Sequence, residues 1–206
     1  MYDHQTHSLW SHLRGEPVVG ALAHAGIRLT ALPVVVTSWR EWRAAHPDTT
    51  VLDIKTGYNR DYAPGRPYGR YFASPDTMFP VSPRSDQLQT KDLVFAVRLG
   101  AAHKVYPLDA LRGTPVVNDR VGETNLVVLS QPEQRTARAY ERGTVIFQAG
   151  IGPGELIEPA TGVRWRVEEE RLSEPASGRM LRRLGGHVVY WFGWYAFYPD
   201  AEVYRP

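Results

Sequence analysis

The chain has 206 residues, of which 43% are hydrophobic and 22% are charged, a composition typical of a folded globular protein and not of a disordered one. The formal net charge of +2 gives no electrostatic signature of nucleic-acid binding, and the lack of cysteine excludes disulfides, thiolate catalysis and cysteine-ligated zinc. No run of about 18 apolar residues occurs, so we expect no membrane-spanning helix.

The first residues bear on cellular location. They do not resemble a secretory signal, because no basic residue is followed by an apolar stretch. A genuine start at Met1 indicates a cytoplasmic protein, whereas a missing upstream segment indicates an exported one, so location stays open.

Residues 1–37 predict short strands separated by turns. Two brief strands are expected at residues 8–10 and 17–19. Residues 27–32 alternate between the two faces as a half-buried strand does, and residues 34–36 are three valines, which favour a further strand.

A short helix is predicted next. Ser38 is a good N-cap, and Glu41 three residues later completes a capping box. Trp39, Trp42 and His46 fall on one helix face, and the proline that follows ends the helix. A helix of about two turns is unstable alone, so we expect its tryptophan face to pack against the protein.

Residues 53–91 contain five prolines and four tyrosines without periodicity, which predicts a long, ordered and packed loop. Guanidinium, carboxylate and phenol groups together suit a small anionic or polar ligand such as a carboxylate, phosphate or sugar. The candidate ligand-binding residues in the loop are Arg60, Asp61, Tyr62, Arg66 and Tyr68. The alternative is that Arg60 and Asp61 only anchor the loop.

The centre of the chain is predicted to be rich in strands. The expected strands are residues 93–97, 104–106, 116–117, 125–129, 137–140 and 144–147, with one helical turn at 107–111. Asn118 and Asp119 read as a hairpin turn more readily than as an acid/base pair.

The end of the chain repeats its beginning. All six tryptophans are matched: Trp10 with Trp165, Trp39 with Trp191, and Trp42 with Trp194. The second copy is more apolar around its helix, so we expect it to lie deeper in the protein. The two tryptophan segments are interpreted as paired keystones of one core.

The predicted fold is α+β and mainly β, with antiparallel strands and an internal pseudo-twofold repeat whose units each end in a short tryptophan-rich helix. We predict one domain, residues 1–206, containing repeat unit one (1–52), a central β-rich region with the long loop (53–154) and repeat unit two (155–206). The first unit begins inside its first strand, so we hypothesise a shortened chain and a homodimer that covers the unpaired strand edge.

Several motifs together resemble the DUF3179 family, a domain of unknown function. They are residues 1–10, residues 15–20, Trp39 to Pro47, Arg60 to Tyr62, Pro67-Tyr68, Tyr106-Pro107, Val117 to Asp119 and Trp191 to Pro199. The resemblance therefore covers nearly the whole chain and implies no mechanism. The chain departs from the family in two places: the family usually has glycine where His7 stands, and it usually carries an upstream Cys-Pro region. The resemblance implies that many relatives are exported, which speaks against the cytoplasmic interpretation and leaves location open.

The histidines invite a metal site at His4, His7 and His12. His7 lies on the opposite strand face from the other two, and His4 and His12 are far apart along a continuous strand, so we expect surface histidines, no metal site and no cofactor. His46 is interpreted first as a packed aromatic position and kept as a candidate ligand-binding residue.

Two functions remain open. One is a domain that binds a small ligand or a partner through the Tyr/Arg loop. The other is an enzyme, for instance a hydrolase, which would need Asp61, His46 and Asp119 gathered within hydrogen-bond reach in one cleft.

Overall fold

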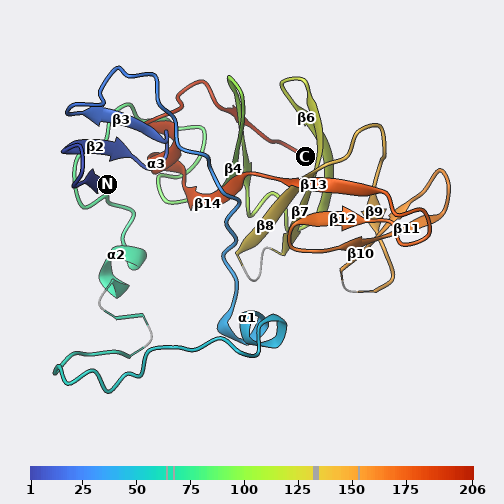
Figure 1. The fold of residues 1–206 in the computed structure, drawn as a ribbon, viewed down its shortest axis with the longest axis horizontal. Coiled ribbons are helices and arrows are strands. Elements are labelled where there is room, and N and C mark those ends of the chain that lie inside the picture. Colours follow the sequence, from blue (N-terminus) through green and yellow to red (C-terminus); the bar gives the residue numbers. More distant parts are fainter. Residues whose placement is uncertain (64, 67, 132–134, 153) are drawn as a thin grey trace.

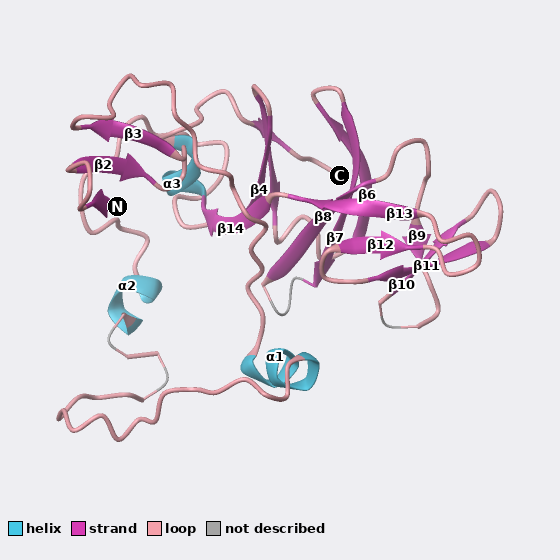
Figure 2. Ribbon diagram, viewed as in Figure 1, coloured by secondary structure: helices cyan, strands magenta, loops and turns pink. Residues whose placement is uncertain are grey.

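A computed structural model describes residues 1–63, 65–66, 68–131, 135–152 and 154–206. Over these ranges the protein is mainly β, with three antiparallel-dominated sheets and three short helices (Figures 1 and 2). The prediction of a mainly β protein built from antiparallel strands is therefore confirmed.

The first sheet is formed by the N-terminal residues. Its order is β1-β2-β3, with β1 Tyr2–Asp3, β2 Ser8–Ser11 and β3 Glu16–Val19, all antiparallel. Ser8 is fully buried, and its hydroxyl accepts a hydrogen bond from the Leu22 backbone N–H at 3.1 Å. Gly20 passes so close that an added Cβ would lie 2.5 Å from the His7 carbonyl oxygen, so only glycine fits there.

The second sheet has eight antiparallel strands in the order β6-β7-β8-β13-β12-β11-β10-β9 and curls into a nearly closed, barrel-like shape. Its strands are β6 Val116–Val121, β7 Thr124–Gln131, β8 Thr136–Glu141, β9 Gln148–Ala149, β10 Glu155–Glu158, β11 Val163–Val167, β12 Arg171–Ser173 and β13 Met180–Leu184. Trp165, Tyr140 and Phe147 are buried together among its strands.

Asn118 joins the two ends of this sheet. Its side-chain amide donates to the Phe147 carbonyl at 2.7 Å and its side-chain oxygen accepts from the Phe147 N–H at 2.8 Å. Asn118 lies in the middle of β6 and Phe147 directly precedes β9. The two side-chain hydrogen bonds therefore connect the two edges of the sheet in place of backbone hydrogen bonds between strands. The expected hairpin turn at Asn118 and Asp119 is wrong, because the turn comes later, between β6 and β7.

The third sheet, in the order β14-β4-β5-β15, packs against the second. Its strands are β14 Gly186–Tyr190, β4 Leu93–Leu99, β5 Ala102–Pro107 and β15 Glu202–Val203, the last parallel to β5. Strand β4 is buried on both faces, which explains its unbroken apolar sequence. Phe95 and Val97 face the second sheet, while Val94 and Ala96 face the C-terminal helix.

The two tryptophan helices differ in burial. Helix α3, Trp191–Tyr195, buries Trp191 and Trp194 to 1% exposure against the third sheet, so the deeper placement expected for the second tryptophan helix is observed. Helix α1, Trp39–Ala45, has the predicted capping box but no buried residue, and it stands apart from the sheets (Figure 1). The expectation that the first tryptophan face is a core keystone is wrong.

The chain between the first and third sheets is mostly irregular. The strands predicted at residues 27–32 and 34–36 do not form, because no neighbouring strand pairs with this extended segment, and residues 144–147 likewise form no strand. The predicted long loop contains helix α2, Gly69–Ala73. Lys91 ties this region to the body, since its ammonium group donates to the carbonyls of Tyr71 at 2.5 Å and Ser74 at 2.7 Å.

Candidate functional site

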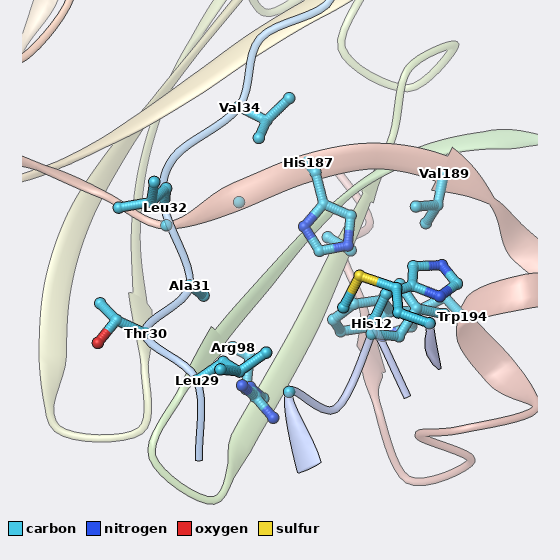
Figure 3. A pocket seen from close by; sticks show the side chains of 16 residues that line it. His12, Leu29, Thr30, Ala31, Leu32, Val34, Arg98, His187, Val189 and Trp194 are labelled. Atoms are coloured by element: carbon cyan, nitrogen blue, oxygen red, sulfur yellow. The ribbon is translucent and has the colours of Figure 1, made fainter. Parts of the chain in front are cut away.

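A cavity among the described residues lies beside β14. It is an open cleft of about 530 Å³ between one face of β4 and β14 and an extended segment, residues 29–34, which we call the strap (Figure 3). Leu29, Leu32 and Val34 line it from the strap, and Ala96 and Val189 line it from the sheet. This volume and mainly apolar lining are typical of a small-molecule site.

The N-terminal sheet holds one end of the strap in place. The Leu29 backbone N–H donates to the Gly15 carbonyl at 2.9 Å, in the turn between β2 and β3. Beside it, Arg28 forms an ion pair with Glu16 at 2.5 Å. The strap is thus fixed by contacts at its beginning, while Leu32 is 75% exposed and Val34 is 55% exposed.

A network of hydrogen bonds docks the N-terminal sheet on the body at the cleft. The Arg98 guanidinium donates to the Arg14 carbonyl at 3.1 Å and to the Tyr198 hydroxyl at 3.0 Å. The Tyr198 hydroxyl in turn donates to the Leu13 carbonyl at 3.1 Å. Because Arg98 also lines the cleft, the same side chain builds the wall and presents a positive charge to it.

The polar end of the cleft gathers nitrogen-bearing side chains from four parts of the chain. They are His12 after β2, Arg98 on β4, His187 on β14 and Trp194 on α3. The rings of His187 and Trp194 meet edge to face, with centroids 5.6 Å apart. Within the described part of the chain, neither His187 Nε2 nor Trp194 Nε1 has a hydrogen-bond partner, although both atoms are buried.

Burial governs the titration of His187. Desolvation lowers the pKa of His187 below its ordinary value, and the nearby His12 and Arg98 lower it further. His187 is therefore neutral at neutral pH, while Arg98 keeps its charge. The cleft can thus offer one fixed cation, a neutral imidazole and an indole N–H to a ligand.

The sequence-predicted loop residues lie elsewhere. Asp61 pairs with Arg66 at 3.6 Å, and the Tyr62 hydroxyl shares a hydrogen bond of 2.7 Å with Thr56. These side chains, like Arg60 and Tyr68, are exposed, and none lines the cleft. Pro64 and Pro67, which belong to the predicted loop and its family motif, lie outside the described residues. The ligand-binding role of the loop stays a prediction.

The three residues of the enzyme hypothesis have different partners. His46 stacks on Trp42 with ring centroids 4.1 Å apart, and Asp61 pairs with Arg66 as above. Asp119 accepts a hydrogen bond from the Tyr106 hydroxyl and pairs with Lys104, both at 2.9 Å. Within the described residues, no hydrogen bond or ion pair joins His46, Asp61 and Asp119 to one another.

The N-terminal histidines also separate. The His7 ring shares a hydrogen bond of 2.5 Å with the Tyr2 hydroxyl, whereas His12 faces the cleft. Among the described residues, no three His, Cys, Asp or Glu side chains are grouped as metal ligands would be.

Reasoning from the sequence missed the cleft residues Arg98, His187 and Trp194. A lone histidine within the apolar run that forms β14 was an available signal, because a half-buried histidine needs hydrogen-bond partners. The role of Arg98 had no local signal, since its partners lie far away in the sequence.

The family comparison agrees with the motif resemblance. The model of the family described as "Protein of unknown function (DUF3179)" matches residues 1–201. No curated protein matches the chain, and no solved structure matches it. Of the helices in the described ranges, none has the length and apolar character needed to cross a membrane.

Proposed function

Because the chain belongs to the DUF3179 family, whose function is unknown, we propose a function from its own geometry: a non-catalytic domain that binds a small, mainly apolar molecule in the cleft beneath the strap. The observation that carries this proposal is the combination of about 530 Å³ of mainly apolar space with two buried nitrogens that lack partners. Exposed apolar side chains on the strap support it as well, because a bound apolar molecule would remove them from water.

A neutral fluorescent probe, N-phenyl-1-naphthylamine, tests the proposal. We expect its fluorescence to rise to saturation as one probe binds per chain. Val34→Trp should fill the cleft and weaken binding by about tenfold or more, which corresponds to about 1.4 kcal/mol.

Val36→Trp is the matched control, because Val36 lies on the same segment, is 46% exposed and does not line the cleft. It should leave the probe affinity within about twofold of the wild type. A probe signal that does not saturate, or equal weakening by the two variants, would overturn the proposal.

The Tyr/Arg loop is a second proposed ligand site. The exposed rings of Tyr62 and Tyr68, at 48% and 57%, and the Asp61–Arg66 pair support it. A ligand that binds the Val34→Trp variant normally but loses affinity on Arg60→Ala and Tyr62→Ala would locate binding at the loop. Unchanged binding in both loop variants would count against it.

We further propose that repeat units one and two, within one domain, derive from a single duplicated element. In support, the pairings Tyr2–Leu9 and Ile157–Arg164 occupy equivalent positions, as do the first residues of α1 and α3. The homodimer is likewise a proposal, supported by the edge positions of β1 and β3 in the first sheet. Light scattering that gives the mass of one chain would refute the dimer.

A further inference from the structure

We infer that the ligand of the cleft is an amphiphilic monocarboxylate, with its carboxylate at the polar end formed by His12, Arg98, His187 and Trp194 and its apolar body beneath the strap. This inference rests on the proposed binding function and names the class of ligand that the same site takes.

The first argument is the unused donor of Trp194. This side chain is 1% exposed, and its Nε1 lacks a partner among the described residues. An indole N–H can only donate, so a buried one without an acceptor costs about 1–3 kcal/mol. A ligand oxygen that reached Nε1 would recover that loss, which an apolar molecule alone cannot do.

The second argument is His187, whose ring contacts that of Trp194. Its Nε2 is buried and unpartnered in the described structure, and its ring meets that of Trp194 edge to face with centroids 5.6 Å apart. A neutral imidazole carries one N–H, so the Nε2–H tautomer supplies a second donor. Two donors on rings that contact each other suit the two oxygens of a carboxylate better than the single oxygen of an alcohol.

The third argument is charge. The residues that line the cleft include Arg98 and two histidines and, within the described chain, no Asp or Glu. The guanidinium of Arg98 is charged at every relevant pH, and burial keeps His187 neutral near pH 7. The positive charge of Arg98 matches one carboxylate, whereas a dianionic phosphate would leave a charge poorly compensated in a largely apolar cleft.

The apolar body of the ligand follows from the rest of the lining. Leu29, Leu32 and Val34 line the cleft from the strap and Val189 lines it from β14, with His187 drawn between the strap and Val189 (Figure 3). A straight or compact hydrocarbon portion would cover these side chains. Each Å² of apolar surface that it removes from water would stabilise the complex by about 25 cal/mol.

The test is displacement of N-phenyl-1-naphthylamine by four ligands of equal chain length: decanoate, decanol, decylamine and decylphosphonate. We expect decanoate to displace the probe at a concentration at least about tenfold lower than decanol, with decylamine weakest, since charge complementarity favours the anion. Decylphosphonate should bind less tightly than decanoate. Equal competition by decanoate and decanol would overturn the inference and leave the binding function intact, and tighter decylphosphonate binding would overturn the carboxylate assignment.

Substitutions of cleft residues test whether the preference for decanoate over decanol arises in the cleft. Arg98→Met should reduce the ratio of decanoate to decanol affinity, but this variant also loses the contacts of Arg98 with Arg14 and Tyr198. His187→Phe therefore serves as the second variant, because it keeps a ring of similar size, and it should lower the ratio by about fivefold.

His103→Phe is the matched control for His187→Phe. His103 is partly buried and stacks on Tyr198 with centroids 4.3 Å apart, but it does not line the cleft. The ratio should be unchanged in this variant, and an equal fall in both histidine variants would overturn the assignment of the carboxylate to the cleft. Failure of the wild-type protein to bind either the probe or decanoate would instead reject the binding function itself.

Discussion

Asp119 offers the sharpest test of how this fold is held together. It lies on β6, where its carboxylate accepts from the buried Tyr106 hydroxyl at 2.9 Å and pairs with Lys104 at 2.9 Å. Tyr106 is 0% exposed, and the Lys104 side chain is 14% exposed. Replacing Asp119 by alanine therefore leaves the buried Tyr106 hydroxyl without a hydrogen-bond acceptor. It also removes the nearest partner of the largely buried Lys104 ammonium group.

The expected cost follows from these two losses. A buried hydroxyl without a partner costs about 1–3 kcal/mol. Lys104 keeps Glu202 at 3.5 Å, and the Glu202 side chain is 73% exposed, so the lost ion pair is partly replaced and adds about 1 kcal/mol. We expect Asp119→Ala to lower the free energy of unfolding by about 2–4 kcal/mol in total.

Urea unfolding followed by tryptophan fluorescence and circular dichroism measures this loss. Asp109→Ala is the control: Asp109 pairs with Arg112 at the same 2.9 Å, but its side chain is 82% exposed, so the change should stay below about 1 kcal/mol. Tyr106→Phe removes the hydroxyl that Asp119→Ala leaves without an acceptor. The double variant Asp119→Ala/Tyr106→Phe should therefore lose less stability than the sum of the losses in the two single variants. A loss below about 1 kcal/mol for Asp119→Ala, or strict additivity, would refute the reasoning.

Three further outcomes are expected. His7 has φ of +54°, so His7→Gly should stabilise the N-terminal sheet by up to about 1 kcal/mol, seen as slower amide exchange in β2, whereas His4→Gly should not. Burial raises the pKa of Tyr140 to about 12, so the folded state keeps a phenol proton that the unfolded state loses near pH 10. The free energy of unfolding should therefore fall as the pH rises from about 10 to about 12, and Tyr140→Phe should make this fall less steep in urea titrations at alkaline pH. Trp194→Ala should lower the free energy of unfolding by about 3–5 kcal/mol, whereas Trp42→Ala should lower it by less than about 1 kcal/mol because Trp42 is 39% exposed. Equal losses in urea unfolding would contradict the assigned burial of the two helices.

Several elements of this chain could be predicted from neighbouring residues in the sequence. The capping box of Ser38 and Glu41 predicted the start of α1, and the apolar run of β4 predicted a buried strand, because both depend on neighbours in the sequence. The greater burial of the second tryptophan helix was also predictable from its apolar surroundings.

The failures have one physical cause. Residues 27–32 alternate like a strand, but a strand needs a partner for its backbone groups, and no strand in the described ranges pairs with this segment. Likewise, α1 has the pattern of a packed helix, yet none of its residues is buried. Asn118 was assigned to a turn because its long-range partner, Phe147, cannot be read from nearby residues.

The sequence by itself determined the family, the mainly β character and the start of the capped helix α1, because motifs, periodicity and caps are local properties. Only the tertiary structure decided the candidate site. Arg98, His187 and Trp194 belong to three different elements, and His12 comes from the opposite end of the chain, so their meeting depends on how the sheets pack. The unused donor of Trp194 is a property of that packing, since only burial makes an unpaired N–H costly.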